Sequence, residues 1–353
     1  MKRLLSIIIL LAVLMTACYF MPPESKLPAE LTGYGTGLEV HFIDVGQADC
    51  ALVICEGRAM LIDGGNYTDS SLIYSYLRDM GIRYLDCVIA THPHEDHIGG
   101  ISGALCFADA GECFSPMAET DNSFFDKLTR KLDEKGIPLT VPSPGDGFSL
   151  GGASVTFLGP MEITNDDNDN SLVLRLVYHD VSFLFTGDAG EKAEKRILDS
   201  GRSIESTVLK VGHHGSRDSS SYQFLRAVNP AYAVISVEDN SRHGHPHEET
   251  LSRLYDSGAA VYRTDKNGTV VFRSDGYALI VNAEKGDATE AAADSAETDP
   301  AETAEPMYIG NISSQVYHRP NCHSLPSEQN RVYLYSLEEA VNSGFHPCGY
   351  CKP

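Results

Sequence analysis

One short stretch of the chain, residues 91–100 with the sequence THPHEDHIGG, limits the possible folds more than any other. It places four potential metal ligands within six residues: His92, His94, Asp96 and His97. Imidazole and carboxylate groups suit zinc, iron or manganese. The run 86–90 before it is typical of a buried strand, and the two glycines that end it permit a tight turn into a helix. Because loops at strand ends commonly carry functional groups, we expect a metal site here and not a histidine-rich surface loop.

Polar residues that follow other predicted strands suggest the rest of this site. Asp63 and Asp188 each come shortly after an apolar strand. His213 and His214 stand together between glycines after a third strand, where imidazoles are unusual as packing residues. The plain alternatives are a turn aspartate at 63 and a helix N-cap at 188.

Periodicity gives a coarse secondary structure around these motifs. Apolar spacing predicts helices at 70–80 and 123–135, and alternation predicts a strand at 154–158. We also expect strands 261–264 and 269–272 to pair as a hairpin around the turn sequence DKNG. At 353 residues the chain is long enough for more than one domain.

The ordered set of motifs resembles the signature of the metallo-β-lactamase superfamily, and it is more similar still to the soluble domain of ComEC-type DNA-uptake proteins and the stand-alone hydrolases like it. The motifs are FIDVGQAD at 42–49, LIDGG at 61–65, the histidine cluster, LFTGD at 184–188, LKVGHHGS at 209–216 and HGHP at 243–246. The resemblance covers roughly residues 38–282. It implies an α/β fold, the αββα sandwich in which two mixed β-sheets lie between helices.

The resemblance also implies a two-metal hydrolase site. One divalent ion, zinc or manganese, is held by His92 and His94. The second is held by Asp96, His97 and one residue of the pair His213 and His214, of which we favour His214; the other donates a hydrogen bond or a proton. Asp188 bridges both ions, which activate a water for attack on the substrate.

Other residues are expected around these ligands. His245 resembles the family's last site histidine, which binds metal or contacts the leaving group as an acid. The resemblance thus implies three catalytic residues: Asp96, His214 and His245. Three residues are expected to orient ligands from behind: Asp44, Asp63 and Asn170. His243 and His247 are expected to be exposed loop residues.

The sequence departs from the superfamily in one respect. Many members carry a third histidine ligand for the first ion between the cluster and the bridging aspartate. The only histidine in that interval, His179, lies in a predicted hairpin turn. We therefore expect the segment 169–171, through Asp169, Asn170 or Ser171, to line the site instead.

The N-terminus predicts export. A basic start, an apolar run at 4–13 and small residues before Cys18 are typical of a secretory signal. The segment resembles a bacterial lipoprotein signal at 1–17, which implies that Cys18 carries the lipid, that 18–37 is a tether, and that the protein sits on the outer face of the cell membrane. An uncleaved N-terminal anchor is the alternative.

The C-terminus predicts a separate module. Residues 283–306 are acidic, contain no aromatic residue and are expected to form a disordered linker. Residues 307–353 then carry two ligand pairs whose spacing fits one structural zinc: His318, Cys322, Cys348 and Cys351. His323 and His346 are possible substitutes, and a disulfide is the alternative use of the cysteines. The module resembles the small zinc-binding module of Ada-type DNA repair proteins.

Charge qualifies the choice of substrate. The net charge is −22, and an acidic body does not attract a phosphate polymer by its overall field. The leading hypothesis is a membrane-tethered, metal-dependent nuclease or phosphodiesterase that acts on extracellular DNA. The alternatives are a cell-wall phosphodiesterase of the phosphorylcholine type and a non-catalytic, metal-stabilised lipoprotein that binds DNA or a partner. No protein partner can be inferred.

Overall fold

The computed structural model describes residues 37–286 and, near the C-terminus, residues 308–351 except 312–313, 321, 323, 328–329, 335–339, 341–342 and 350. The predicted signal, Cys18 and most of the predicted tether and linker lie outside the described residues, and so does His323. In the part of the chain that is described, no helix has both the length and the apolar character needed to cross a bilayer.

Two mixed sheets form the body of the molecule. The first has eight strands in the order β17-β16-β1-β2-β3-β5-β7-β8. Its strands are β1 (Leu38–Phe42), β2 (Ala51–Cys55), β3 (Arg58–Ile62), β5 (Cys87–Ile89), β7 (Cys113–Phe114), β8 (Leu139–Thr140), β16 (Val270–Ser274) and β17 (Leu279–Ala283). Pairing is antiparallel from β17 to β3 and parallel from β3 to β8.

The second sheet has seven strands in the order β15-β14-β13-β12-β11-β10-β9. Its strands are β9 (Gly147–Leu150), β10 (Ala153–Gly159), β11 (Val173–Tyr178), β12 (Val181–Phe185), β13 (Val208–Lys210), β14 (Tyr232–Ile235) and β15 (Ala260–Arg263). Neighbours from β9 to β12 are antiparallel, and neighbours from β12 to β15 are parallel. A minor parallel pair, β4 (Tyr84–Leu85) and β6 (Asp109–Ala110), lies beside the first sheet.

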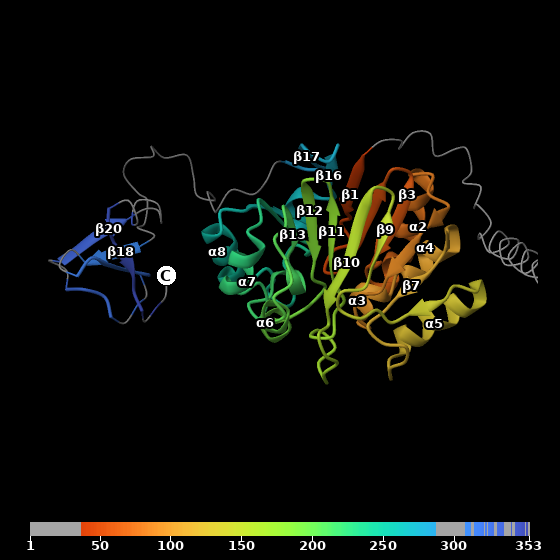
Figure 1. Cartoon of the computed structure of the whole chain (residues 1–353), viewed down its shortest axis with the longest axis horizontal. Helices are drawn as coiled ribbons and strands as arrows, with labels where there is room; N and C mark the ends of the chain where they lie inside the picture. Colours follow the sequence, from red (N-terminus) through yellow and green to blue (C-terminus); the bar gives the residue numbers. More distant parts are fainter. Residues whose placement is uncertain are drawn as a thin grey trace, which may run out of the picture.

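Helices cover the outer face of each sheet (Figure 1). The helices are α2 (Ser70–Asp79), α3 (Glu95–Ile98), α4 (Ile101–Phe107), α5 (Ser123–Lys135), α6 (Glu191–Asp199), α7 (Tyr222–Val228), α8 (Glu248–Asp256) and α9 (Thr264–Asn267), with 3-10 turns η1 (Tyr67–Asp69) and η2 (Gly212–Gly215). The predicted helices at 70–80 and 123–135 are thus confirmed, as is the predicted strand at 154–158.

Three apolar layers hold this arrangement together. The central layer joins the inner faces of both sheets, where Phe42 and Phe272 of the first sheet meet Phe183 and Phe185 of the second. The two outer layers lie between each sheet and its helices. The central strands β2, β12 and β13 are buried on both faces, which explains their continuous apolar sequences. The predicted αββα sandwich is therefore confirmed.

One predicted pairing is wrong. The segments 261–264 and 269–272 do not form a hairpin, because β15 belongs to the seven-stranded sheet and β16 to the eight-stranded sheet. The residues between them form the short helix α9, which carries the chain across the sandwich. The local turn sequence could not reveal this, because β15 pairs with β14 and β16 with β1 and β17, and the turn does not encode those pairings.

The C-terminal module has its own small sheet, with strands in the order β20-β18-β19-β21 (Figure 1, blue). These strands are β18 (Tyr308–Asn311), β19 (Val316–His318), β20 (Arg331–Leu334) and β21 (His346–Pro347). Its described core is a small cluster of Tyr308, Tyr317, Leu334 and Ala340, with Val332 and Phe345 packed against it. A core of this size does not stabilise a domain alone, so a metal or a comparable constraint is required.

Candidate metal centre

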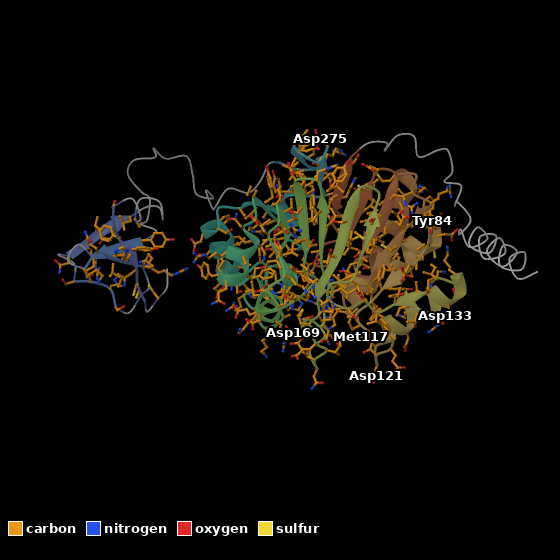
Figure 2. All side chains as sticks on the ribbon, in the orientation of Figure 1. Tyr84, Met117, Asp121, Asp133, Asp169 and Asp275 are labelled. Atoms are coloured by element: carbon orange, nitrogen blue, oxygen red, sulfur yellow. The ribbon has the colours of Figure 1, made fainter. Side chains whose placement is uncertain are left out.

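The predicted ligands meet at one edge of the sandwich. The carboxyl ends of β3 and β5 in the first sheet, and of β12 and β13 in the second, all open onto this edge. Figure 2 labels Asp169, Met117 and Asp121 on loops along the same edge, whereas Asp275 marks the opposite one. Parallel strands with adjacent carboxyl ends bring loop residues together, which explains how segments distant in sequence share one site.

The six central residues form two groups. His92, His94 and Asp188 make one, and Asp96, His97 and His214 make the other; within each group the potential ligand atoms lie within 4.8 Å of one another. Asp188 lies between the groups. Its Oδ1 is 3.2 Å from Nε2 of His97, and its Oδ2 is 3.8 Å from Nε2 of both His92 and His214. The structure therefore brings together the residues predicted to hold two ions, with the predicted bridging residue in the centre.

Several potential metal-ligand atoms at this centre have no hydrogen-bond partner. Among the described residues, the buried atoms of this kind include Nε2 of His92, His97 and His214 and Oδ1 of Asp188. A buried polar atom without a partner costs about 1–3 kcal/mol. Four such atoms converging from three loops would be costly as packing, and they have the donor chemistry that divalent zinc or manganese requires. The residues present thus fit the implied pair of ions.

Hydrogen bonds behind the ligands fix which ring nitrogen faces the site. Nδ1 of His97 lies 2.8 Å from Oδ2 of Asp63, and Nδ1 of His214 donates to the carbonyl of Ser236 at 3.0 Å. Each Nε2 thereby faces the centre, where an ion that displaces its proton could bind. Asp63 also accepts hydrogen bonds from the backbone and hydroxyl of Thr91, so it joins two adjoining loops.

In the metal-free site, the neighbouring carboxylates stabilise the protonated form of two imidazoles. Burial alone would lower the pKa of His214, but Asp188, Asp49 and Asp96 raise it to about 10. The pKa of His97 is likewise raised well above its ordinary value by Asp188 and Asp63, against the effect of burial. An ion that binds here therefore displaces protons, as is general for histidine ligands.

The loop that carries His213 and His214 has an unusual backbone. Both residues have positive φ angles of 50° inside η2. This conformation costs about 1–3 kcal/mol for a non-glycine residue and persists where the surroundings enforce it, often at functional sites. The turn directs His214 inward, where its side chain is buried, and leaves His213 nearer the surface, with Nε2 3.7 Å from Oδ2 of Asp188. The favoured choice of His214 as the ligand of the second group thus agrees with its position.

The remaining predicted histidines lie at the rim. The His94 side chain is 39% exposed and its Nε2 lies 4.0 Å from Asp167. The Nδ1 of His245 contacts the Gln47 amide at 3.2 Å, and its ring centroid is 5.5 Å from that of His213. Burial and the neighbouring histidines lower the pKa of His245 to about 4. It is therefore an uncharged imidazole at neutral pH in the metal-free site.

Asp44 and Asn170, which were expected to orient ligands, form other hydrogen bonds. The Asp44 carboxylate accepts a hydrogen bond from the Gly46 amide and so shapes a turn, and the Asn170 side chain ties its loop to Thr164. Ser171, an alternative named for that segment, takes the inner position: its hydroxyl lies 3.4 Å from Nδ1 of His92 and accepts from the backbone N–H of Asp188. Among the described residues, neither the Asp44 nor the Asn170 side chain has a hydrogen bond or ion pair with a predicted ligand, so the expected orienting role has no support at these two positions.

The sequence reasoning missed Asp49. Its buried carboxylate lies 3.4 Å from Nδ1 of His214, and its backbone N–H donates to the carbonyl of Asp96 at 3.0 Å. The side chain of Lys210 pairs with it at 2.8 Å. Both residues stand inside motifs quoted above, and a lysine in an otherwise apolar strand is the signal that could have revealed the pair.

Two grooves reach the centre from different sides. One, of about 820 Å³, is lined by His94 and Asp96 together with Gln47, Asn66, Asp69, Glu95, Phe124, Glu238, Arg242 and others. The other, of about 470 Å³, is lined by Asp166, Asn168, Asp169, Asp188, Gly190, Glu191, Lys192, His213 and Asp218. Each lining contains several carboxylates and one basic side chain. The approach to the centre is therefore acidic as well as open.

A second candidate metal site lies in the C-terminal module. Ligand atoms of His318, Cys322, Cys348 and Cys351 lie within 4.8 Å of one another, and all but Cys351 are buried. The described cysteines are free thiols, which argues against the disulfide alternative. His346 is exposed on β21 and does not join the group. One histidine and three cysteines in this arrangement match a closed structural zinc site.

Comparisons with known proteins agree with both parts of this description. A family model described as the metallo-beta-lactamase superfamily matches residues 43–238, and one described as the metal binding domain of Ada matches residues 294–353. ComE operon protein 3 of Bacillus subtilis (strain 168) is 30% identical over 254 residues, which cover 67% of this chain and 33% of that protein. Competence protein ComA of Neisseria gonorrhoeae is 32% identical over 232 residues, covering 65% and 31%. This chain therefore spans about a third of the length of these relatives.

Among solved structures, the metallo-beta-lactamase fold protein YhfI from Bacillus subtilis covers 67% of this chain and 100% of its own, with a TM-score of 0.48 and 15% identity.

Proposed function

Because this chain belongs to the metallo-beta-lactamase superfamily and is related to competence proteins, we propose that it is a metal-dependent phosphodiesterase that cleaves DNA outside the cell. The observation that carries the proposal is the position of Asp188 between two ligand groups, with all six residues on one open edge. That arrangement suits hydrolysis at a charged centre, and the relatives direct the choice of DNA.

The charge of the centre favours a phosphodiester. Four carboxylates converge there, from Asp49, Asp63, Asp96 and Asp188, together with one ammonium from Lys210. With uncharged imidazoles and two divalent ions, the centre would carry one net positive charge. A phosphodiester carries one negative charge, so its binding, while the attacking water is still protonated, would leave the buried centre neutral, which avoids the cost of an uncompensated buried charge.

Divalent ions at such a site lower the pKa of water and neutralise charge on the substrate oxygens. The chain's own residues supply the remaining requirements. Asp63 and the Ser236 carbonyl hold the rings of His97 and His214 with Nε2 toward the centre. We propose that His245, which lies at the rim beside Gln47, contacts the departing oxygen of the substrate.

A second candidate function follows from the acidic grooves. Glu95 and Glu238 on one side, and Glu191 and Asp218 on the other, disfavour a long polyanion. They favour a small phosphodiester with a neutral or cationic alcohol, such as a phosphorylcholine ester. The two candidates share one chemistry and differ only in what flanks the phosphate.

The experiment compares both substrate types directly. Purified full chain loaded with manganese or zinc is assayed on supercoiled plasmid, on bis(p-nitrophenyl) phosphate and on p-nitrophenyl phosphorylcholine. Asp188→Asn tests dependence on the centre, and Asp199→Asn, an exposed carboxylate on α6, is the matched control. Nicking of plasmid by wild type and control but not by Asp188→Asn supports the nuclease. Cleavage of only the choline ester supports the second candidate. No cleavage by a metal-loaded protein contradicts both and favours a non-catalytic binding role.

Export and membrane attachment belong to the same proposal. They rest on residues 1–18, whose basic, apolar and small segments precede Cys18. The zinc module is proposed to serve the same substrate, because modules of the Ada type occur in DNA repair proteins.

A further inference from the structure

Lys210, the last residue of β13, is an unusual lysine. It is the one lysine among the described residues that is buried, with 4% of its surface exposed. Lysines are almost never fully buried unless they are paired. It belongs to neither ligand group, and the proposed function counts only its charge, so its position needs a separate explanation.

The partners of Lys210 lead to the metal centre. Its Nζ donates to Oδ2 of Asp49 at 2.8 Å and to the Val211 carbonyl at 2.8 Å. Burial alone would raise the pKa of Asp49, but Lys210 and His214 more than offset this and hold the pKa well below its ordinary value. A small cavity of about 10 Å³ beside the pair has room for at most one water, so bulk solvent cannot replace the ammonium.

Asp49 in turn contacts the second ligand group at three points. Its Oδ1 lies 3.4 Å from Nδ1 of His214, and its Oδ2 lies 4.0 Å from Nδ1 of His97. Its backbone N–H donates to the carbonyl of Asp96. All three members of one ligand group therefore have an atom within 4.0 Å of this residue, whereas no hydrogen bond or ion pair joins it to His92 or His94 among the described residues.

An ordinary structural ion pair would not need this geometry. Replacing a buried ion pair by apolar residues is often neutral or stabilising, so such a pair is not retained for stability as a rule. Here the carboxylate pairs with an ammonium on one side and faces two imidazoles, at 3.4 and 4.0 Å, on the other. In many metal sites a carboxylate orients a histidine ligand. Asp49 is placed like such a carboxylate, and Lys210 adds a charged residue behind it.

We infer that Lys210 is a positioning residue for the ion site formed by Asp96, His97 and His214. Its ammonium offsets the charge of Asp49, and the Asp49 carboxylate, 3.4 Å from Nδ1 of His214, supports electrostatically the ring orientation that the hydrogen bond to the Ser236 carbonyl sets. The inference rests on the proposed metal centre and extends it to Lys210, a residue that binds no ion and lies behind Asp49. It predicts that the two ions respond differently when this pair is altered.

The test measures metal affinity and not only activity. Lys210→Met, Asp49→Asn and the double variant are titrated with cobalt in the full chain, with Lys195→Met as the matched control because Lys195 is exposed and pairs at the surface with Asp199. The cysteine-rich module gives cobalt–thiolate bands that the nitrogen and oxygen ligands of the centre do not, so it is an internal standard. We expect Lys210→Met to weaken one of the two ions of the centre by roughly 10–100-fold and to leave the other unchanged.

The double variant separates positioning from stability. If Lys210 acts through Asp49, the double variant binds cobalt no more weakly than Asp49→Asn alone. Urea unfolding of the metal-free variants is measured in parallel. A lower unfolding free energy with two wild-type cobalt affinities would show a purely structural lysine and overturn the inference. Equal weakening of both ions would overturn it as well.

The outcome is independent of the substrate question. If wild type binds two ions but cleaves no phosphodiester, the proposed function fails and the selective loss in Lys210→Met still tests the inference. If wild type nicks plasmid and Lys210→Met retains both ions, the inference fails and the proposed function stands.

Discussion

Glu194 gives this fold a pH dependence that can be calculated. The residue lies on α6 and is buried, with 2% of its surface exposed. Its carboxylate accepts hydrogen bonds from the backbone N–H groups of Ser220 and Ser221. These serines end the loop that begins with His213 and His214, so Glu194 braces the ligand loop from behind. Burial raises its pKa from 4.5 to about 7, although the two N–H groups act in the opposite direction.

The sign of the effect follows from proton linkage. Between pH 4.5 and 7 the folded protein holds this proton more tightly than the unfolded chain does, so its contribution to stability is present at low pH and is lost as the pH rises toward 7. One pKa unit corresponds to about 1.4 kcal/mol. Between pH 5 and pH 8, Glu194 should therefore lower the free energy of unfolding by about 2.5 kcal/mol.

Glu194→Gln removes this titration and keeps a carbonyl acceptor. Urea unfolding of wild type and variant, at pH 5 and pH 8 with a chelator present, should show a pH-dependent loss that is about 2.5 kcal/mol smaller in the variant. Glu134→Gln, which replaces an exposed carboxylate on α5, should behave as wild type. An unchanged pH dependence in Glu194→Gln would refute the reasoning, because it would mean that the carboxyl group does not keep its proton on folding.

Three further changes should have distinct effects. Asp63→Asn removes the charge behind His97 and should weaken metal binding by roughly 10–100-fold while leaving the protein folded, as measured by chelator competition. Cys348→Ser should unfold only the C-terminal module, so proteolysis should trim the chain near residue 307 and leave a resistant core; a chain that remains intact would contradict a structural zinc there. Cys18→Ala should move the protein from the membrane to the soluble fraction of expressing cells, and retention at the membrane would contradict lipid attachment at that residue.

The sequence predicted those features that local patterns determine. Helix α5 follows from apolar spacing, with Asn122 as its N-cap and Gly136 in a left-handed conformation after its end. Residue type and spacing indicated the histidine cluster at 92–97 as potential ligands, and the resemblance to the family implied the bridging role of Asp188. The hairpin at 261–272 failed because the strands' real partners lie in different sheets, and no local pattern states which sheet a strand joins.

The same limit explains the errors at the site. Asp44 and Asp49 are both aspartates of one motif, and only the fold shows that the first caps a turn while the second reaches His214. Asn170 and Ser171 are adjacent, and the side chain that faces His92 depends on how their loop packs. Contacts made across loops from different strands could not be read from spacing alone.

The count of bound ions tests the central claim most directly. Elemental analysis of the full chain after removal of loosely bound metal should find three ions in wild type, two in the hydrolase domain and one in the module. Cys348→Ser should retain two, and a variant with both His92 and His97 replaced by alanine should retain only the module's zinc. A Cys348→Ser chain that carries no metal would contradict the account, because the grouped imidazoles and carboxylates would then serve some purpose other than holding ions.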